Sequence, residues 1–161
     1  GVTQRLRAPD GMALKSIQFG ERNDRPCYLQ AVFTTFDGGF NSGSRTFDRC
    51  NGSRGDLRTV EIATSASNLQ WASGIQVCQR RQNDRLKGIR LSGSRVDAQG
   101  THHDPAIQAV QERPNCNQWA QQAFCTQGSV VTEVEVHYRT TGNRPAEITG
   151  LAVTCAQAAV R

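Results

Sequence analysis

The hexapeptide LKGIRL, at Leu86–Leu91, has two counterparts in the same chain: LKSIQF at Leu14–Phe19 and ITGLAV at Ile148–Val153. Each reads apolar, polar, small, apolar, any residue, apolar, and this length and composition are typical of a β-strand. Repeated β-units cannot bury their apolar faces alone and must stack on one another. The three phrases therefore predict three similar units around one core, arranged as a prism of three sheets or as a trefoil.

The rest of the chain alternates short strand-like segments with turns rich in Gly, Asn, Ser and Pro. The strand-like segments are rich in Val, Ile, Phe and Thr, as strands usually are. They stand at Tyr28–Phe33, Arg58–Thr64, Ser73–Cys78, Ala106–Val110 and Thr132–Tyr138. A chain of 161 residues has the length of one domain. We predict a single all-β domain over residues 1–161.

The repetition extends beyond the hexapeptides. Cys50–Ile62 parallels Cys125–Val136, because each runs from a cysteine through a Gly-containing turn into an alternating strand with a Val-Glu pair. LKGIRL and ITGLAV would then close these two units, and LKSIQF would close a third. The small third residue of each phrase predicts close approach of a neighbouring strand, or a bulge. These small residues are Ser16, Gly88 and Gly150.

The six cysteines indicate disulfides and an oxidising compartment, because they include no CxxC pair and have no zinc-type spacing to histidine. The protein is therefore expected to be secreted, extracellular or periplasmic. The similar spacing within the two units predicts two pairs and leaves a third by elimination. The predicted pairs are Cys50–Cys78, Cys125–Cys155 and Cys27–Cys116.

The charge is moderately basic, with a net value of +5 and only two lysines, Lys15 and Lys87. The arginines are scattered rather than gathered in a stripe with aromatic residues, which argues against a nucleic-acid partner. A planar guanidinium does suit carboxylate, sulfate or phosphate. No apolar run reaches the roughly 18 residues of a membrane-spanning helix.

An Asn-Asp-Arg motif recurs and is the main candidate for a binding site. Amide, carboxylate and guanidinium groups together can hydrogen-bond the vicinal hydroxyls of a sugar. The alternative is that Asn and Asp build turns, which repeated units reuse. The motif stands at Asn23–Arg25 and at Asn83–Arg85, and a remnant without the Asp stands at Asn143-Arg144. The candidate ligand-binding residues are Asn83, Asp84, Arg85, Asn143 and Arg144.

Trp71 is the aromatic candidate, since an indole can stack on the apolar face of a sugar ring; core packing is its alternative role. His102, His103 and Asp104 are adjacent, but successive strand residues point to opposite faces, and the sequence places no further ligand beside either histidine. A solvated turn is therefore expected there rather than a metal site. Arg54–Asp56 reads RGD, which three residues can produce by chance. No nucleophile motif is evident. We predict no catalytic residue, no metal and no cofactor.

Gln118–Cys155 resembles one repeat of the vitelline membrane outer layer protein I family, over about the last 40 residues of the chain. The matching residues are Trp119, Cys125, Gly128, Gly150, Leu151, Val153 and Cys155. The resemblance implies a disulfide-stabilised β-prism of three Greek-key units with pseudo-threefold symmetry, similar to jacalin-type lectins, with Trp119 in the core. This sequence departs from the family in two places. No cysteine follows LKGIRL, and the family's acidic pair before the closing strand is replaced by Asn83-Asp84-Arg85 in one repeat and by Asn143-Arg144 in the other.

These observations favour a secreted, carbohydrate-binding, lectin-like module that recognises a cell-surface or extracellular polysaccharide. An anionic glycan would contact Arg85 and Arg144, which precede equivalent strands. The first alternative is a structural or surface-docking extracellular module, such as a layer component or a toxin accessory domain, without a small-ligand site. A glycan-active hydrolase or transferase is the second alternative, and a non-enzymatic role is favoured.

Overall fold

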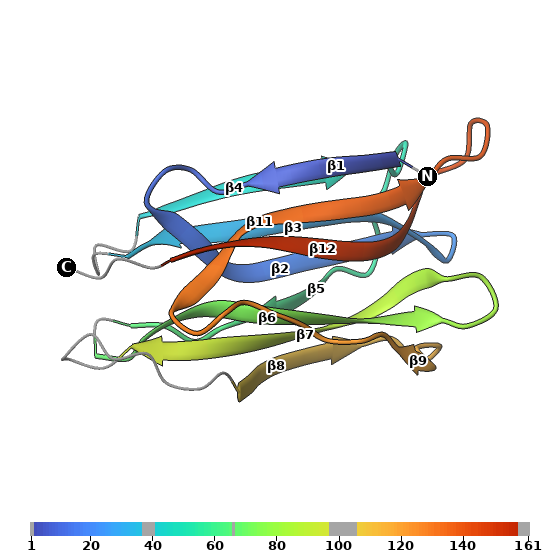
Figure 1. Ribbon diagram of the computed structural model, residues 1–161. Helices are drawn as coiled ribbons and strands as arrows, with labels where there is room; N and C mark the ends of the chain where they lie inside the picture. Colours follow the sequence, from blue (N-terminus) through green and yellow to red (C-terminus); the bar gives the residue numbers. More distant parts are fainter. Residues whose placement is uncertain (1, 37–40, 66, 97–105, 158–161) are drawn as a thin grey trace.

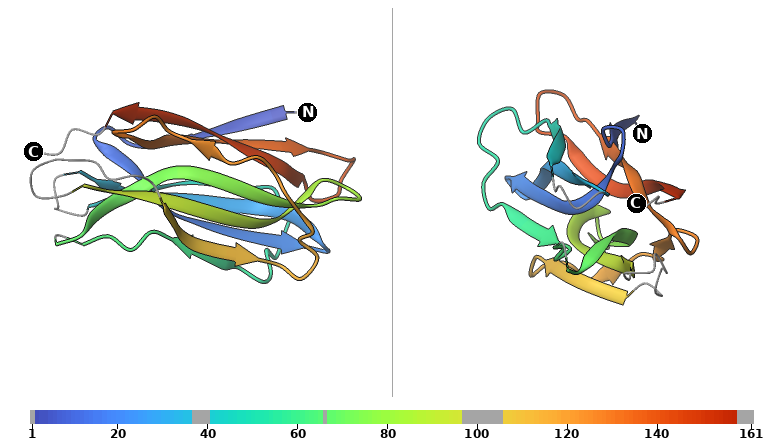
Figure 2. Two further views of the ribbon diagram at one scale, coloured as in Figure 1. Left: turned by 60° about the horizontal axis from the view of Figure 1, so that its bottom comes forward. Right: turned by 90° about the vertical axis from the view of Figure 1, so that its left-hand side faces the viewer.

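The computed structural model describes residues 2–36, 41–65, 67–96 and 106–157. Within these ranges it contains twelve β-strands and no helix. The strands form three sheets that face one another around a common interior (Figure 1, Figure 2). The predicted all-β prism is therefore confirmed.

The first sheet is a Greek key with the strand order β4-β3-β2-β5. Its strands are Met12–Arg22 (β2), Arg25–Thr35 (β3), Ser42–Asp48 (β4) and Arg58–Glu61 (β5). β2 and β3 form a hairpin that closes with Arg22 opposite Arg25. β5 returns to pair with β2, which completes the Greek key.

The second sheet repeats this arrangement with the order β10-β6-β7-β8, and β9 also pairs with β6. Its strands are Leu69–Arg80 (β6), Arg85–Val96 (β7), Ala106–Glu112 (β8), Gln118–Trp119 (β9) and Ala123–Phe124 (β10). The third sheet has the order β1-β11-β12. It contains Val2–Arg7 (β1), Ser129–Arg139 (β11) and Glu147–Gln157 (β12).

The core lies where the inner faces of the three sheets meet. Alternate residues of a strand point to opposite faces, so each long strand sends one set of apolar side chains inward. The core includes Phe19 and Phe33 from the first sheet, Ile89 from the second, and Val134 and Val136 from the third. Burying one such side chain contributes about 1.5–3 kcal/mol. The shared core is what joins sheets that could not be stable separately.

One predicted equivalence between the repeats is wrong. LKGIRL lies in β7 and ITGLAV in β12, and both are second strands of their hairpins. LKSIQF lies in β2, which is the first strand of its hairpin. The counterpart of LKGIRL in the first sheet is therefore β3. The shared pattern reports an apolar face turned to the core, which first and second strands both have.

The small residues at the third position of the phrases also differ in role. A Cβ added to Gly88 would lie 3.1 Å from the Gln111 carbonyl and from the Cys78 Cβ, so close approach is confirmed there. A Cβ added to Gly150 would meet nothing within 4 Å, so close approach is wrong for Gly150. The predicted alternative, a bulge, is confirmed beside all three small residues, because the pairing register shifts directly before Ser16, Gly88 and Gly150. Gly88 lies on an interior strand with neighbours on both sides, whereas β12 is an edge strand.

Three disulfides staple the prism: Cys27–Cys50, Cys78–Cys116 and Cys125–Cys155. The predicted Cys125–Cys155 pair is confirmed. The predicted Cys50–Cys78 and Cys27–Cys116 pairs are wrong, because Cys50 follows β4 in the first sheet whereas Cys78 lies on β6 in the second. β4 pairs with β3, and this pairing brings Cys50 beside Cys27.

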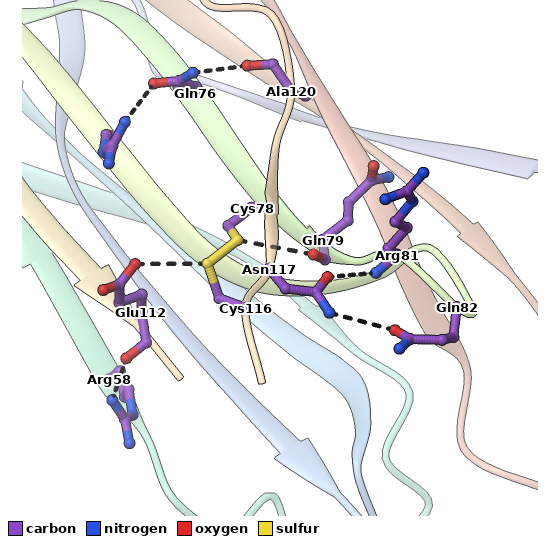
Figure 3. The surroundings of a disulfide bond; sticks show 11 residues. Arg58, Gln76, Cys78, Gln79, Arg81, Gln82, Glu112, Cys116, Asn117 and Ala120 are labelled. Atoms are coloured by element: carbon purple, nitrogen blue, oxygen red, sulfur yellow. Dashed lines mark hydrogen bonds between the residues drawn. A yellow bond between two sulfur atoms is a disulfide. The ribbon is translucent and has the colours of Figure 1, made fainter. Parts of the chain in front are cut away.

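Figure 3 shows the Cys78–Cys116 bridge, which joins β6 to the connection between β8 and β9. Beside it, the side-chain carbonyl of Asn117 accepts a hydrogen bond from the backbone N–H of Arg81 at 2.7 Å. The Asn117 amide donates to Gln82 Oε1 at 3.4 Å. The bridge and Asn117 together tie the β8–β9 connection to β6 and to the β6–β7 turn.

Candidate functional site

The hairpins β2–β3, β6–β7 and β11–β12 all turn at the same end of the prism, which we call the turn end (Figure 1). In the first two turns, Asn23, Asp24 and Asp84 have φ angles of 52°, 63° and 58°. Asn and Asp adopt this left-handed conformation more readily than other non-glycine residues. Turn geometry therefore accounts for the recurrence of Asn-Asp in the sequence.

Beneath these turns, Glu147 joins all three sheets through ion pairs. Its carboxylate, at the start of β12, accepts hydrogen bonds from Arg25 of β3, from Arg85 of β7 at 2.8 Å and from Arg139 of β11 at 2.7 Å. The Glu147 side chain is only 7% exposed. Burial raises the pKa of Glu147, but Arg85 and Arg139 outweigh burial and hold the pKa below its ordinary value. Glu147 is therefore ionised at neutral pH.

A second part of the network surrounds the ammonium of Lys87, whose side chain is 0% exposed. The ammonium donates to Asp24 Oδ1 at 2.6 Å and to Glu21 Oε2 at 3.0 Å. Asp24 also accepts hydrogen bonds from Arg85 and from the Asn115 amide, each at 3.1 Å. Burial raises the pKa of Asp24, but Lys87, Asn115 and Arg85 together hold it below its ordinary value. These charges satisfy one another within the protein.

The predicted residues Asn83, Asp84 and Arg85 belong to this network or to its turn. The Arg85 side chain is 17% exposed, and both of its carboxylate partners come from other sheets. Asn83 Oδ1 accepts the backbone N–H of Arg85 at 3.1 Å, and the Asn83 carbonyl accepts from Arg139. Asp84 is exposed and lines a depression of about 580 Å³ between β6 and β12. The structure does not bring these three side chains together at one open surface.

The position of Trp71 contradicts the prediction that its indole stacks on a sugar ring. Its side chain is 0% exposed, its Nε1 donates to Thr34 Oγ1 at 3.1 Å, and its ring meets Phe36 edge-on at 5.4 Å between centroids. Trp71 is a core residue, because strand alternation turns it inward. Trp119, expected in the core, is only partly buried, and the Arg90 guanidinium lies 3.8 Å from its ring centroid.

The remaining predicted residues, Asn143 and Arg144, lie in the β11–β12 loop beside a depression of about 640 Å³. This depression opens at the turn end between the first and third sheets, and we call it the Arg49 depression. Its lining residues are Gln4, Thr46, Asp48, Arg49, Asn51, Thr140, Gly142, Arg144 and Ala146.

Contacts between the two sheets fix the walls of the Arg49 depression. The Ala146 N–H donates to the Arg49 carbonyl at 3.1 Å, which ties the start of β12 to the end of β4. The Asn51 amide donates to the Asn143 carbonyl at 3.3 Å, which holds the β11–β12 loop. Asn51 also follows the Cys27–Cys50 disulfide directly. The backbone around the depression is therefore preorganised.

Aromatic rings orient the Arg49 side chain although it is exposed. Its guanidinium lies 5.0 Å from the Tyr138 ring centroid and 5.8 Å from the Phe47 centroid. The two rings pack on each other at 4.8 Å. A cation placed over an aromatic ring gains about 0.5–1 kcal/mol at an exposed site. The depression thus combines one oriented guanidinium with the amide of Asn51, the carboxylate of Asp48 and nearby hydroxyls.

Sequence reasoning missed Asp48, Arg49 and Asn51. Their only signal is a polar cluster on both sides of Cys50, which also fits an ordinary turn. What makes them a site is contact with the β11–β12 loop: Asn51 bonds Asn143, 92 residues away along the chain, and Arg49 bonds Ala146. Only the arrangement of the sheets shows that contact.

The other sequence motifs supply no further site. The His102–Asp104 cluster lies outside the described residues. In the RGD tripeptide, the Arg54 guanidinium lies 4.4 Å from the Tyr28 ring centroid, and the Asp56 carboxylate pairs with Arg113. Among the described residues, no three His, Cys, Asp or Glu side chains are grouped to hold a metal ion. The same part of the chain has no helix long and apolar enough to cross a membrane.

The sequence matches no protein-family model, and no curated protein is significantly similar to it. Solved structures do share its fold. The Calystegia sepium agglutinin is 13% identical, with a TM-score of 0.58, over 98% of this chain and 89% of that chain. Calsepa lectin in complex with a biantennary N-glycan is 15% identical, with a TM-score of 0.57, over 98% of this chain and 90% of that chain.

A prostate-specific WGA16 glycoprotein lectin is 12% identical, with a TM-score of 0.54, over 96% of this chain and 90% of that chain. At these identities the similarity is one of fold. The β-prism expected from the resemblance is therefore confirmed, whereas membership of the vitelline membrane family stays a prediction. This chain has the β-prism fold of jacalin-like lectins.

Proposed function

We propose that this protein is a carbohydrate-binding module that acts outside the cytoplasm and binds glycan in the Arg49 depression. The observation that carries this proposal is the lining of the depression, where guanidinium, carboxylate, amide and hydroxyl groups face one open space. A sugar offers hydroxyl groups that both donate and accept hydrogen bonds, and this set of side chains can meet both needs. Most of these groups stand on a backbone fixed by contacts between sheets.

The fold and the disulfides support the same proposal. The β-prism neighbours are lectins by name, and one of them was solved with an N-glycan bound. Three disulfides favour secretion or another oxidising compartment, because the cytosol keeps thiols reduced. For a hydrolase with paired carboxylates, two carboxyl groups about 5–10 Å apart are needed. Among the described residues that line the depression, Asp48 supplies the only carboxylate, which favours binding over hydrolysis.

A glycan array with two matched variants tests the proposal. Thr140 and Thr141 are both exposed neighbours in the β11–β12 loop, but only Thr140 lines the depression. We expect Thr140→Trp to weaken binding of the best array ligand by roughly tenfold or more, because the indole fills the space that the sugar needs. Thr141→Trp should bind like the wild type.

Two results would count against the proposal. Equal binding by both variants would place the glycan site elsewhere on the prism. No binding to any glycan by correctly folded wild-type protein would favour the structural or surface-docking role instead. Near-ultraviolet circular dichroism of the three proteins confirms that a lost signal is not lost folding.

A further inference from the structure

Five arginines at the turn end have a carboxylate partner within the protein. Each of these makes an ion pair at 4.0 Å or less with Asp24, Asp56 or Glu147. They are Arg25, Arg80, Arg85, Arg113 and Arg139. Their N–H groups are engaged by these internal carboxylates, so they are less available to an external anion than an unpaired guanidinium is.

Arg49 and Arg144 differ from these arginines. Among the residues that the structure describes, neither guanidinium has an ion-pair or hydrogen-bond partner, and both side chains are exposed. Both line the same depression. The one carboxylate beside them is Asp48, whose Oδ1 accepts a hydrogen bond from the backbone N–H of Cys50 at 3.3 Å. The depression therefore has an excess of positive charge and of unused hydrogen-bond donors.

The orientation of Arg49 favours an anion further. Packing against Tyr138 and Phe47 limits the guanidinium to few positions, so less conformational entropy is lost when a ligand binds. Among the described residues the guanidinium N–H groups of Arg49 have no hydrogen-bond acceptor, so they remain available to a ligand. A planar edge with parallel N–H donors matches the two oxygens of a carboxylate or sulfate, and such charge-assisted bonds are about twice as strong as neutral ones.

Resting on the carbohydrate-binding function proposed above, we infer that the Arg49 depression selects acidic glycans, with Arg49 and Arg144 binding the carboxylate or sulfate of one sugar residue. The sequence predicted an anionic ligand at Arg85 and Arg144. We retain Arg144 as a contact and replace Arg85 with Arg49. Arg85 is occupied by Asp24 and Glu147. Because Arg49 and Arg144 are exposed, their attraction for an anion is screened within about 8 Å at physiological salt.

The test compares two forms of one oligosaccharide, of which only the free acid carries negative charge. Binding of an oligogalacturonate hexamer is measured by calorimetry at low salt beside its fully methyl-esterified form, and a heparin hexasaccharide serves as the sulfated probe. We expect the wild type to bind the free acid about tenfold more tightly than the ester, and to lose this preference as salt is added. The double variant Arg49→Gln/Arg144→Gln should bind acid and ester within about twofold of each other.

The control double variant, Arg54→Gln/Arg81→Gln, loses the same net charge from exposed arginines that do not line the depression. It should keep the preference for the free acid. An equal loss in both double variants would mean nonspecific attraction and would overturn the inference. Equal wild-type binding of acid and ester would also overturn it, while leaving the carbohydrate-binding function intact. If no probe and no array glycan binds, the carbohydrate-binding function itself fails.

Discussion

At the scale of single residues, the same turn sequence has two different roles. Asp24 and Asp84 both follow an asparagine in a tight hairpin turn and both have positive φ. Asp24 contacts Lys87, Arg85 and Arg80, whereas Asp84 makes no side-chain ion pair among the described residues. The sequence predicts the turn in both cases, because turn preference is local. It does not predict the partners, since Lys87 lies 63 residues from Asp24 along the chain.

This difference gives a matched pair of variants, Asp24→Asn and Asp84→Asn. Asn tolerates the left-handed backbone, so each change removes one charge and leaves the turn. Asp24→Asn leaves the buried Lys87 with one fewer carboxylate partner and should lower the free energy of unfolding by about 1.5 kcal/mol, a value reduced by partial solvent screening. Asp84→Asn should change it by less than about 0.5 kcal/mol. Urea denaturation at pH 7 measures both, and equal losses would show that the Lys87 cluster adds no stability.

At the scale of strands, the sequence predicted the elements with a clear apolar pattern, including the largely exposed β8, and missed β1. The segments expected at 28–33, 73–78, 106–110 and 132–138 all lie within strands, and the one at 58–64 overlaps β5. β1 was not predicted, because Thr3, Arg5 and Arg7 face solvent and only Leu6 is fully buried. Its partner is supplied by β11, more than a hundred residues later. The spacing of the cysteines gives only their separation along the chain. It does not show which sheet each cysteine belongs to, so the sequence could not predict the pairs Cys27–Cys50 and Cys78–Cys116.

Gly88 and Gly150 occupy equivalent places in the second strands of two hairpins, so they test whether a small residue is needed there. Gly88→Ala should lower the free energy of unfolding by about 1–2 kcal/mol, since the new Cβ would contact the Gln111 carbonyl and two side chains at 3.1 Å. Gly150→Ala meets no atom within 4 Å and should raise it by about 0.5 kcal/mol through the lower entropy of the unfolded chain. Thermal melts of both variants measure the difference, and a destabilised Gly150→Ala would contradict the open edge described for β12.

At the scale of the whole molecule, the ends of the strands decide what the prism can do. The repeated phrases predicted three β-units around one core, as a prism or a trefoil, because the alternation shows that each strand buries one face; the family resemblance favoured the prism. Of the residues that line the Arg49 depression, the sequence predicted only Arg144, since the others come from β1, from both sides of Cys50 and from unremarkable positions of the β11–β12 loop. The same end of the molecule holds the buried network around Glu147. This division separates the residues that stabilise the turn end, such as Arg85, from those that remain open to a ligand, such as Arg49 and Arg144.

The Glu147 network should make the whole prism sensitive to acid, and its sign follows from the lowered pKa. A carboxyl group whose pKa is lower in the folded state contributes its stability above its ordinary pKa, here 4.5, and loses that contribution as the pH falls through the lower folded value. Glu147→Gln should therefore cost about 3 kcal/mol at pH 7, because Arg25 and Arg85 lose their shared buried charge. Below the folded pKa the variant and the wild type should approach the same stability.

Glu61→Gln is the control, since Glu61 is 51% exposed and pairs only with Lys15 among the described residues. An exposed pair of this kind contributes at most about 1 kcal/mol, so the stability of this variant should follow that of the wild type at every pH. Urea denaturation from pH 7 down to acid measures all three proteins. Wild-type and Glu147→Gln curves that stay parallel across this range would mean that Glu147 does not change its protonation on unfolding.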